Sequence, residues 1–133
     1  MNPLSAWQDL AAKSPAICHT LWTPHAGLLE AISGDDESIA ELIDAFKTDT
    51  ETRILRICAA LEIADVARLR SEAHSMNGSA RQIGAEALAE VCRQLELASA
   101  LTPLSHLSGQ VLRIQELFGE VACAMTAYQA FQS

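Results

Sequence analysis

A histidine and a glycine stand one helical turn apart in the stretch AHSMNGSARQIGA, residues 73 to 85, which otherwise has the pattern of a helix. The imidazole of His74 is a good nucleophile near pH 7. Gly78 weakens a helix by about 1 kcal/mol relative to alanine, so its position requires a reason. Bare backbone beside an imidazole lets another molecule approach closely. The pair therefore predicts a docking surface with chemistry, provided that both residues face solvent.

Helical geometry predicts that they do. Apolar and small residues recur every three or four positions and form a seam that faces the core. At about 100° per residue, His74 lies roughly 130° from the middle of that seam, and Gly78 lies one turn further along the exposed face. The seam consists of Val66, Leu69, Ala73, Met76, Ala80 and Ile83. The candidate supporting and docking residues on this face and its edges are Arg70, Ser71, Asn77, Arg81 and Gln82.

The other histidines and the cysteines give weaker signals. An exposed histidine on a helix is usually a solvated surface residue, which is the alternative for His74 and the prediction for His19, His25 and His106. The cysteines stand far apart without a CxxC motif, and we predict no metal site. We interpret them as buried reduced thiols, which suit a cytoplasmic protein. They are Cys18, Cys58, Cys92 and Cys123.

Helices are predicted almost throughout the chain. One or two short helices cover residues 3–22, and a further short segment covers residues 24–34. Asp35 or Asp36 is the expected N-cap of a long helix that reaches about residue 61.

Three more helices follow. Asp65 is the expected cap of the helix that carries His74, and Gly84 is its expected end. A third long helix is marked by the apolar positions of residues 88–98. Pro103 separates it from a fourth helix that covers at least residues 107–125.

No strand-like alternation occurs, so the predicted fold class is all-α. Four amphipathic helices with short connections favour an antiparallel up-down-up-down four-helix bundle, with one or more additional short N-terminal helices. A chain of 133 residues has the size of one domain. We predict a single domain over residues 1–133, in which residues 1–25 are a helical extension and about 26–130 form the bundle.

Charge and composition exclude several classes of function. The net charge is −8, whereas a nucleic-acid-binding face requires an excess of positive charge. No apolar run approaches the roughly 18 residues of a membrane span, and the N-terminus lacks the pattern of a secretory signal. A nucleotide-binding glycine-rich loop is absent, so we expect no autonomous ATP-dependent kinase activity. The expectation is a cytoplasmic monomer with neither nucleic acid nor membrane as a partner.

The segment AHSMNGSARQIGAEALAEVCRQLE, residues 73 to 96, resembles the signature of histidine-containing phosphotransfer (HPt) domains. In that pattern alanine-histidine precedes an apolar residue, lysine, glycine, small residues, an apolar residue and glycine. A helix with leucine and cysteine follows and ends in leucine-glutamate. Upstream, LLEAISGDDESIAELIDAFKTD resembles the usual lead-in, and the resemblance covers roughly residues 26 to 128. The matching positions are His74, Met76, Gly78, Ser79, Ala80, Ile83, Gly84, Ala85, Leu88, Cys92 and Leu95.

The resemblance implies a catalytic role for His74 as phosphoacceptor. The histidine would take a phosphoryl group from an aspartyl-phosphate on a receiver domain and pass it to another receiver in a two-component phosphorelay. Implied partners are response-regulator receiver domains, a hybrid histidine kinase, or both. No intrinsic cofactor is implied, because the Mg²⁺ belongs to the receiver. Phosphoryl transfer requires positioning and positive charge more than covalent machinery, so a small bundle is sufficient.

One position departs from the family pattern. Three residues after the histidine the family usually has lysine, whereas this chain has Asn77. Asparagine donates a hydrogen bond but brings no charge. Arg70 and Arg81 are either substitutes for the lysine or ordinary surface arginines. The departure concerns the efficiency of transfer more than the identity of the phosphorylated residue.

Two further functions remain as alternatives. An HPt-like adaptor would dock a receiver or a histidine kinase and modulate signalling without being phosphorylated; Asn77 favours this reading and the intact His74 disfavours it. A di-iron carboxylate enzyme would need inward-pointing Glu-x-x-His pairs, and the sequence contains none.

Overall fold

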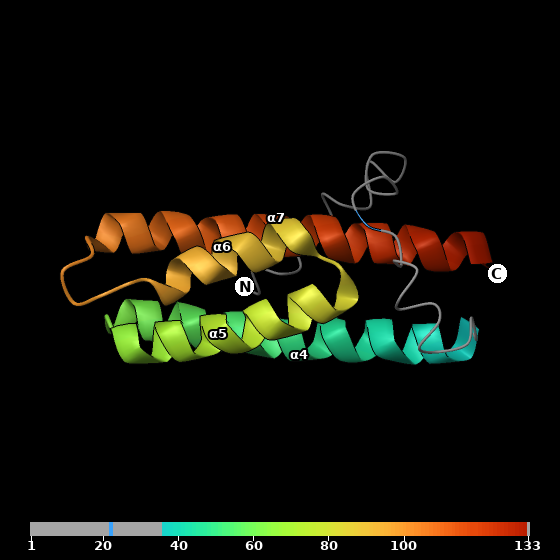
Figure 1. The fold of residues 1–133 in the computed structure, drawn as a ribbon, viewed down its shortest axis with the longest axis horizontal. Helices are drawn as coiled ribbons and strands as arrows, with labels where there is room; N and C mark the ends of the chain where they lie inside the picture. The colour runs from blue at the N-terminus through green and yellow to red at the C-terminus, as the bar shows by residue number, and fades with distance from the viewer. Residues whose placement is uncertain (1–21, 23–35, 133) are drawn as a thin grey trace.

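The computed structural model describes Trp22 and residues 36–132, and the regular structure within these residues is entirely helical (Figure 1). It comprises α4 (Asp36–Glu62), α5 (Val66–Ile83), α6 (Glu86–Glu96) and α7 (Leu104–Gln132). The predicted all-α class is confirmed for this part of the chain. None of the described helices is long and apolar enough to span a membrane. The helices predicted before residue 35 lie outside the described residues.

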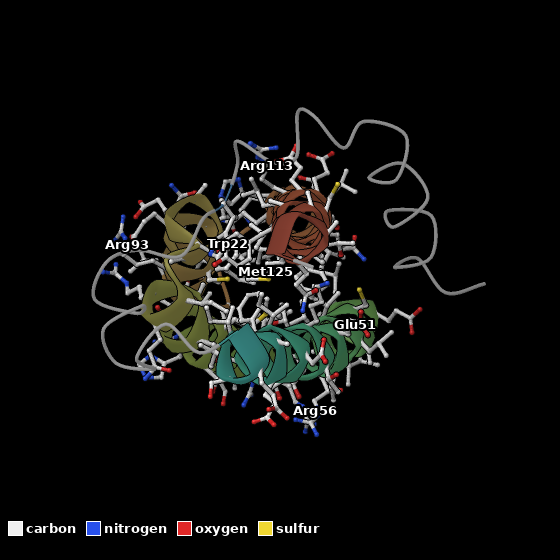
Figure 2. All side chains as sticks on the ribbon, turned by 90° about the vertical axis from the view of Figure 1, so that its right-hand side faces the viewer. Trp22, Glu51, Arg56, Arg93, Arg113 and Met125 are labelled. Atoms are coloured by element: carbon white, nitrogen blue, oxygen red, sulfur yellow. The ribbon has the colours of Figure 1, made fainter. Side chains whose placement is uncertain are left out.

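The four helices lie along one long axis and enclose a common core (Figure 1). α4 packs against α5 and α7, and α6 packs against the same two helices. Each helix turns its apolar stripe inward, and burial of these stripes drives their association. Figure 2 shows Met125 inside the bundle, with Arg56, Arg93 and Arg113 at its outer surface. The most deeply buried large side chains include Ile43, Ile54, Ile57, Leu69, Met76, Leu88, Leu95, Leu107, Ile114 and Phe118.

Both ends of α5 are fixed by the residues expected from the sequence. The Asp65 side chain accepts a hydrogen bond of 3.1 Å from the backbone N–H of Arg68, which satisfies one of the unpaired donors of the first turn. Gly84 ends the helix in the left-handed conformation with φ 83°, which glycine adopts without a steric penalty. The chain turns there, and α6 packs back against α5.

The third helix is shorter than predicted. The apolar pattern extends to Ala98, but α6 ends at Glu96 with Leu97 as its C-cap. Ala98 is nevertheless buried, because the turn that follows the helix also covers the core. The periodic pattern therefore predicted a helix that is about half a turn too long. Glu96 is the last residue of α6.

A buried ion pair joins α5 to α4. The carboxylate of Glu72 is mostly buried and lies 3.0 Å from Nη1 of Arg53 and 3.7 Å from Nη1 of Arg56. Its neighbours Ala73 and Leu69 are fully buried in the same face of α5. This contact joins the inner side of α5 to α4, and His74, two residues after Glu72, lies on the opposite side of the helix.

Trp22 anchors the chain before α4 to the bundle. Its side chain is buried, and its indole Nε1 donates a hydrogen bond of 2.7 Å to the carbonyl oxygen of Ile83. The indole also meets the ring of Tyr128 edge-on, with 5.8 Å between ring centroids. The contact covers the C-terminal end of α5 next to α7.

The prediction of buried reduced thiols is confirmed for Cys92, is only partly met by the half-buried Cys58 and is wrong for Cys123, while Cys18 lies outside the described residues. Cys58 and Cys92 are free thiols, and burial raises the pKa of Cys92 to about 12. Cys123, in contrast, is disulfide-bonded. Apolar spacing correctly indicates that Cys123 is buried, but it does not reveal whether a second sulfur lies beside it. The cysteine pattern consequently no longer supports a cytoplasmic location.

Candidate functional site

His74 projects from α5 into solvent, as its helical position predicted. Its side chain is 80% exposed, whereas the preceding Ala73 is fully buried. Gly78 is also exposed, and a Cβ added there would meet no atom within 4 Å. Packing of the bundle therefore does not require a glycine at this position. The pair forms an open surface with an imidazole beside bare backbone.

A glutamate from the next helix contacts the imidazole. Oε1 of Glu96, the last residue of α6, pairs with Nδ1 of His74. A carboxylate only accepts hydrogen bonds, so Nδ1 of His74 is the donor, and in the neutral imidazole the lone pair then lies on Nε2. The Glu96 side chain is only 20% exposed, which strengthens the interaction relative to a fully hydrated pair. Glu96 thus orients the imidazole and fixes its tautomer.

Three further α5 side chains join the same contact network. Nδ2 of Asn77 donates to the second carboxylate oxygen of Glu96 at 3.0 Å. Nε of Arg81 donates to Oδ1 of Asn77 at 2.8 Å, and Nε of Arg70 donates to the backbone carbonyl of Glu96 at 3.1 Å. Glu96 is therefore held through both carboxylate oxygens and its main chain.

Helix α5 carries more basic than acidic side chains, although the chain as a whole is acidic. Helix α5 carries Arg68, Arg70 and Arg81, all exposed, and a single acidic residue, Glu72, which the arginines of α4 already neutralise. The chain as a whole has a net charge of −8. These arginines offer positive charge to an anionic group that approaches α5, whereas the charged group in contact with the imidazole itself is the Glu96 carboxylate.

A protein-family model described as "Hpt domain" matches residues 41–126, which is about two thirds of the chain. The chain belongs to the Hpt domain family. No curated protein and no solved structure shows a significant match to it. Membership implies phosphotransfer in two-component signalling, and Hpt domains interact with receiver domains and kinases in phosphorelays.

The Hpt domain brings together four of the residues that the sequence singled out. His74, Arg70, Asn77 and Arg81 meet around Glu96, which sequence reasoning did not select. The signal that could have found Glu96 was present: the family pattern ends in leucine-glutamate, and this glutamate lies at the end of the helix that pairs with α5.

The remaining candidates lie on the same helix. Ser71 and Gln82 are exposed, as predicted. Gln82 lines a separate depression of 420 Å³ between α4 and α5, together with Ser79 and Phe46. Within the part of the chain that the structure describes, no group of three or more His, Cys, Asp or Glu side chains could hold a metal ion.

Proposed function

We propose that His74 is the phosphoacceptor of this Hpt domain: it takes a phosphoryl group from an aspartyl-phosphate of a receiver domain and passes it to another receiver. One observation carries the proposal. The imidazole is 80% exposed while Glu96 engages its Nδ1 atom, so that the nucleophilic Nε2 atom is available to a partner.

The transfer needs little chemistry from the bundle itself. The Nε2 lone pair attacks phosphorus, a N–P bond forms, and the O–P bond to the receiver aspartate breaks with its electron pair going to the carboxylate. The Nδ1 proton stays in place, and the Glu96 carboxylate compensates the positive charge that develops on the ring. Mg²⁺ bound by the receiver would supply the remaining neutralisation of the phosphoryl oxygens.

The same proposal includes the antiparallel up-down-up-down arrangement of the bundle. It is supported by the cyclic packing of α4, α5, α6 and α7 and by the course of the chain in Figure 1. Such an arrangement presents the outer face of α5 to a partner along its whole length.

A non-phosphorylated adaptor is the second candidate function. It is favoured by Asn77, which replaces the cationic lysine of the family pattern and whose amide nitrogen is engaged by Glu96. Such a protein would dock a receiver or a histidine kinase through the same face of α5.

Incubation with phosphorylated receiver domains, followed by mapping of acid-labile phosphate, distinguishes the two functions. We expect label on His74 and none on a His74→Gln variant of unchanged helix content. His106→Gln is the matched control, because His106 is another exposed histidine, on α7, and its loss should leave labelling intact. Stable receiver binding without any label would favour the adaptor, and full labelling of His74→Gln would refute the assignment.

A further inference from the structure

Asn77 uses its whole amide group inside the helical hairpin of α5 and α6. Its nitrogen donates to Glu96 and its oxygen accepts from Arg81. A guanidinium only donates, so Arg81 requires the amide oxygen on its own side and directs the amide nitrogen to the carboxylate. At the position where the family pattern has a cation, this chain has a neutral side chain with a defined orientation.

The orientation matters because Glu96 ends a helix. A terminal glutamate normally retains considerable rotamer freedom, which is lost only where several contacts act together. Here one carboxylate oxygen pairs with His74 and the other accepts from Asn77, while Arg70 fixes the backbone carbonyl. Removal of the Asn77 contact would leave the carboxylate attached to the imidazole alone.

We propose that Asn77 and Arg81 are positioning residues that lock the Glu96 carboxylate onto Nδ1 of His74 and thereby keep the phosphoryl group readily transferable. The inference rests on the proposed function of His74. Asn77 stands where the family pattern has lysine. It holds a carboxylate in place, whereas a lysine would bind the phosphoryl group as a cation.

The chemistry of the outgoing step explains the benefit. When a receiver carboxylate attacks phosphorus, the N–P bond breaks and its electron pair returns to Nε2. If Nδ1 holds its proton, neutral imidazole leaves; if Nδ1 has lost it, the leaving group is the far more basic imidazolate. A locked carboxylate retains the Nδ1 proton. A lysine at position 77 would instead place a cation beside the phosphoryl group, and this attraction would hold the phosphoryl group on the histidine for longer.

A phosphate-free measurement tests the lock directly. ¹⁵N chemical shifts of the His74 ring report which nitrogen carries the proton. We expect the Nδ1–H tautomer to dominate in the wild-type chain and to lose population in Asn77→Asp, which keeps the shape and the contact to Arg81 but cannot donate to Glu96. Arg113→Ala is the matched control for Arg81→Ala, because Arg113 is an exposed arginine on α7 with a single glutamate partner. Unchanged ring shifts in both Asn77→Asp and Arg81→Ala would overturn the proposal.

A double-mutant cycle then tests the consequence for transfer. Asn77→Asp should slow transfer from phosphorylated His74 to a receiver about tenfold, the rate equivalent of one hydrogen bond to a charged group. The same substitution should have little effect in a Glu96→Ala background, because Asn77 acts through Glu96. Equal losses in both backgrounds would mean that Asn77 acts on the phosphoryl group directly and would refute the lock. A wild-type chain that is never labelled would refute the proposed function, and the ring shifts would still decide the lock.

Discussion

Gly78 leaves the surface of α5 open one turn beyond His74. A Cβ at this position would meet no atom of the bundle within 4 Å, so the space above it belongs to whatever approaches the histidine. The glycine costs the isolated helix about 1 kcal/mol relative to alanine. Packing within the bundle does not require this glycine, which agrees with the proposed close approach of a partner.

Replacement of Gly78 by a larger residue should therefore slow phosphoryl transfer without loss of helix content. Gly78→Leu is expected to slow phosphoryl transfer about tenfold or more, because a small displacement of the reacting groups has a large effect on rate. Helix content by circular dichroism should stay unchanged or rise slightly. Gly109→Leu on α7 is the matched control, since Gly109 is also exposed with no atom within 4 Å of its Cβ position. Equal transfer rates for the two variants would contradict the role of Gly78.

The sequence was sufficient to predict the candidate residues that lie on α5. It was not sufficient to predict Glu96, which comes from α6. The direction of His74 follows from 100° per residue, and its 80% exposure agrees with that rule. The contact from Glu96 depends on the register of two helices across a turn, which no periodicity contains. Asn77 was interpreted as a hydrogen-bond donor without charge, but its acceptor Glu96 could be named only when α6 was in place.

The turn between α5 and α6 sets the register of the hairpin. It depends on Gly84, whose φ of 83° places it in the left-handed region. The amide nitrogens of Gly84 and Ala85 bond back to the carbonyls of Arg81 and Ala80, which closes the end of α5. The position of Glu96 beside His74 is a consequence of this turn.

Replacement by alanine should change the free energy of unfolding in opposite directions at Gly78 and at Gly84. Gly84→Ala is expected to lower the free energy of unfolding by about 1–2 kcal/mol, the penalty of a Cβ in the left-handed region. Gly78→Ala should raise it by about 1 kcal/mol because alanine favours the helix. Urea denaturation of the two variants measures both changes. A stabilised Gly84→Ala variant would show that the turn adopts another conformation in solution.

The two ends of α5 were predictable from their caps, whereas the end of α6 was not. Asp65 and Gly84 fulfil a local hydrogen-bonding and a local conformational requirement, so their positions mark α5 correctly. α6 has no side-chain cap at Ala85, and its C-terminal turn remains buried at Ala98. The sequence pattern therefore placed the end of α6 too late.

At the scale of the whole molecule, burial and charge are separated. The core is almost wholly apolar, whereas most of the net charge of −8 lies on the surface. A general excess of one sign opposes self-association, and the arginines on α5 provide a local exception. These arginines lie on the helix that carries the proposed docking face.

The buried thiol of Cys92 should make stability sensitive to alkaline pH. An unfolded thiol ionises near its ordinary pKa of 9.0, while burial raises the native pKa to about 12. Between these pH values the native state binds more protons than the unfolded state. The contribution of the thiol to the free energy of unfolding is therefore fully present below pH 9 and is lost as the pH rises, by up to about 1.4 kcal/mol per pH unit. Urea denaturation between pH 8 and about 11 should show a shallower decline for Cys92→Ala than for the wild-type chain.

Cys58→Ala is the control for this pH dependence, because the Cys58 thiol is only half-buried and its pKa is raised less. Parallel stability curves for Cys92→Ala and the wild-type chain would contradict the assignment.

The all-helical class was predictable from periodicity alone, since the core repeats every three or four residues. The disulfide of Cys123 was not, because it depends on two sulfur atoms meeting in space.

The hydrogen bonds around His74 all join residues of a single short stretch of chain. The separation is 4 residues from Asn77 to Arg81, 22 from His74 to Glu96 and 26 from Arg70 to Glu96. The entropic cost of loop closure grows with separation, and contacts of low sequence separation form quickly. The contact from Trp22 to Ile83, in contrast, closes a loop across 61 residues. The geometry around His74 can therefore assemble early in folding, as soon as the hairpin of α5 and α6 closes and before the loop between Trp22 and Ile83 is closed.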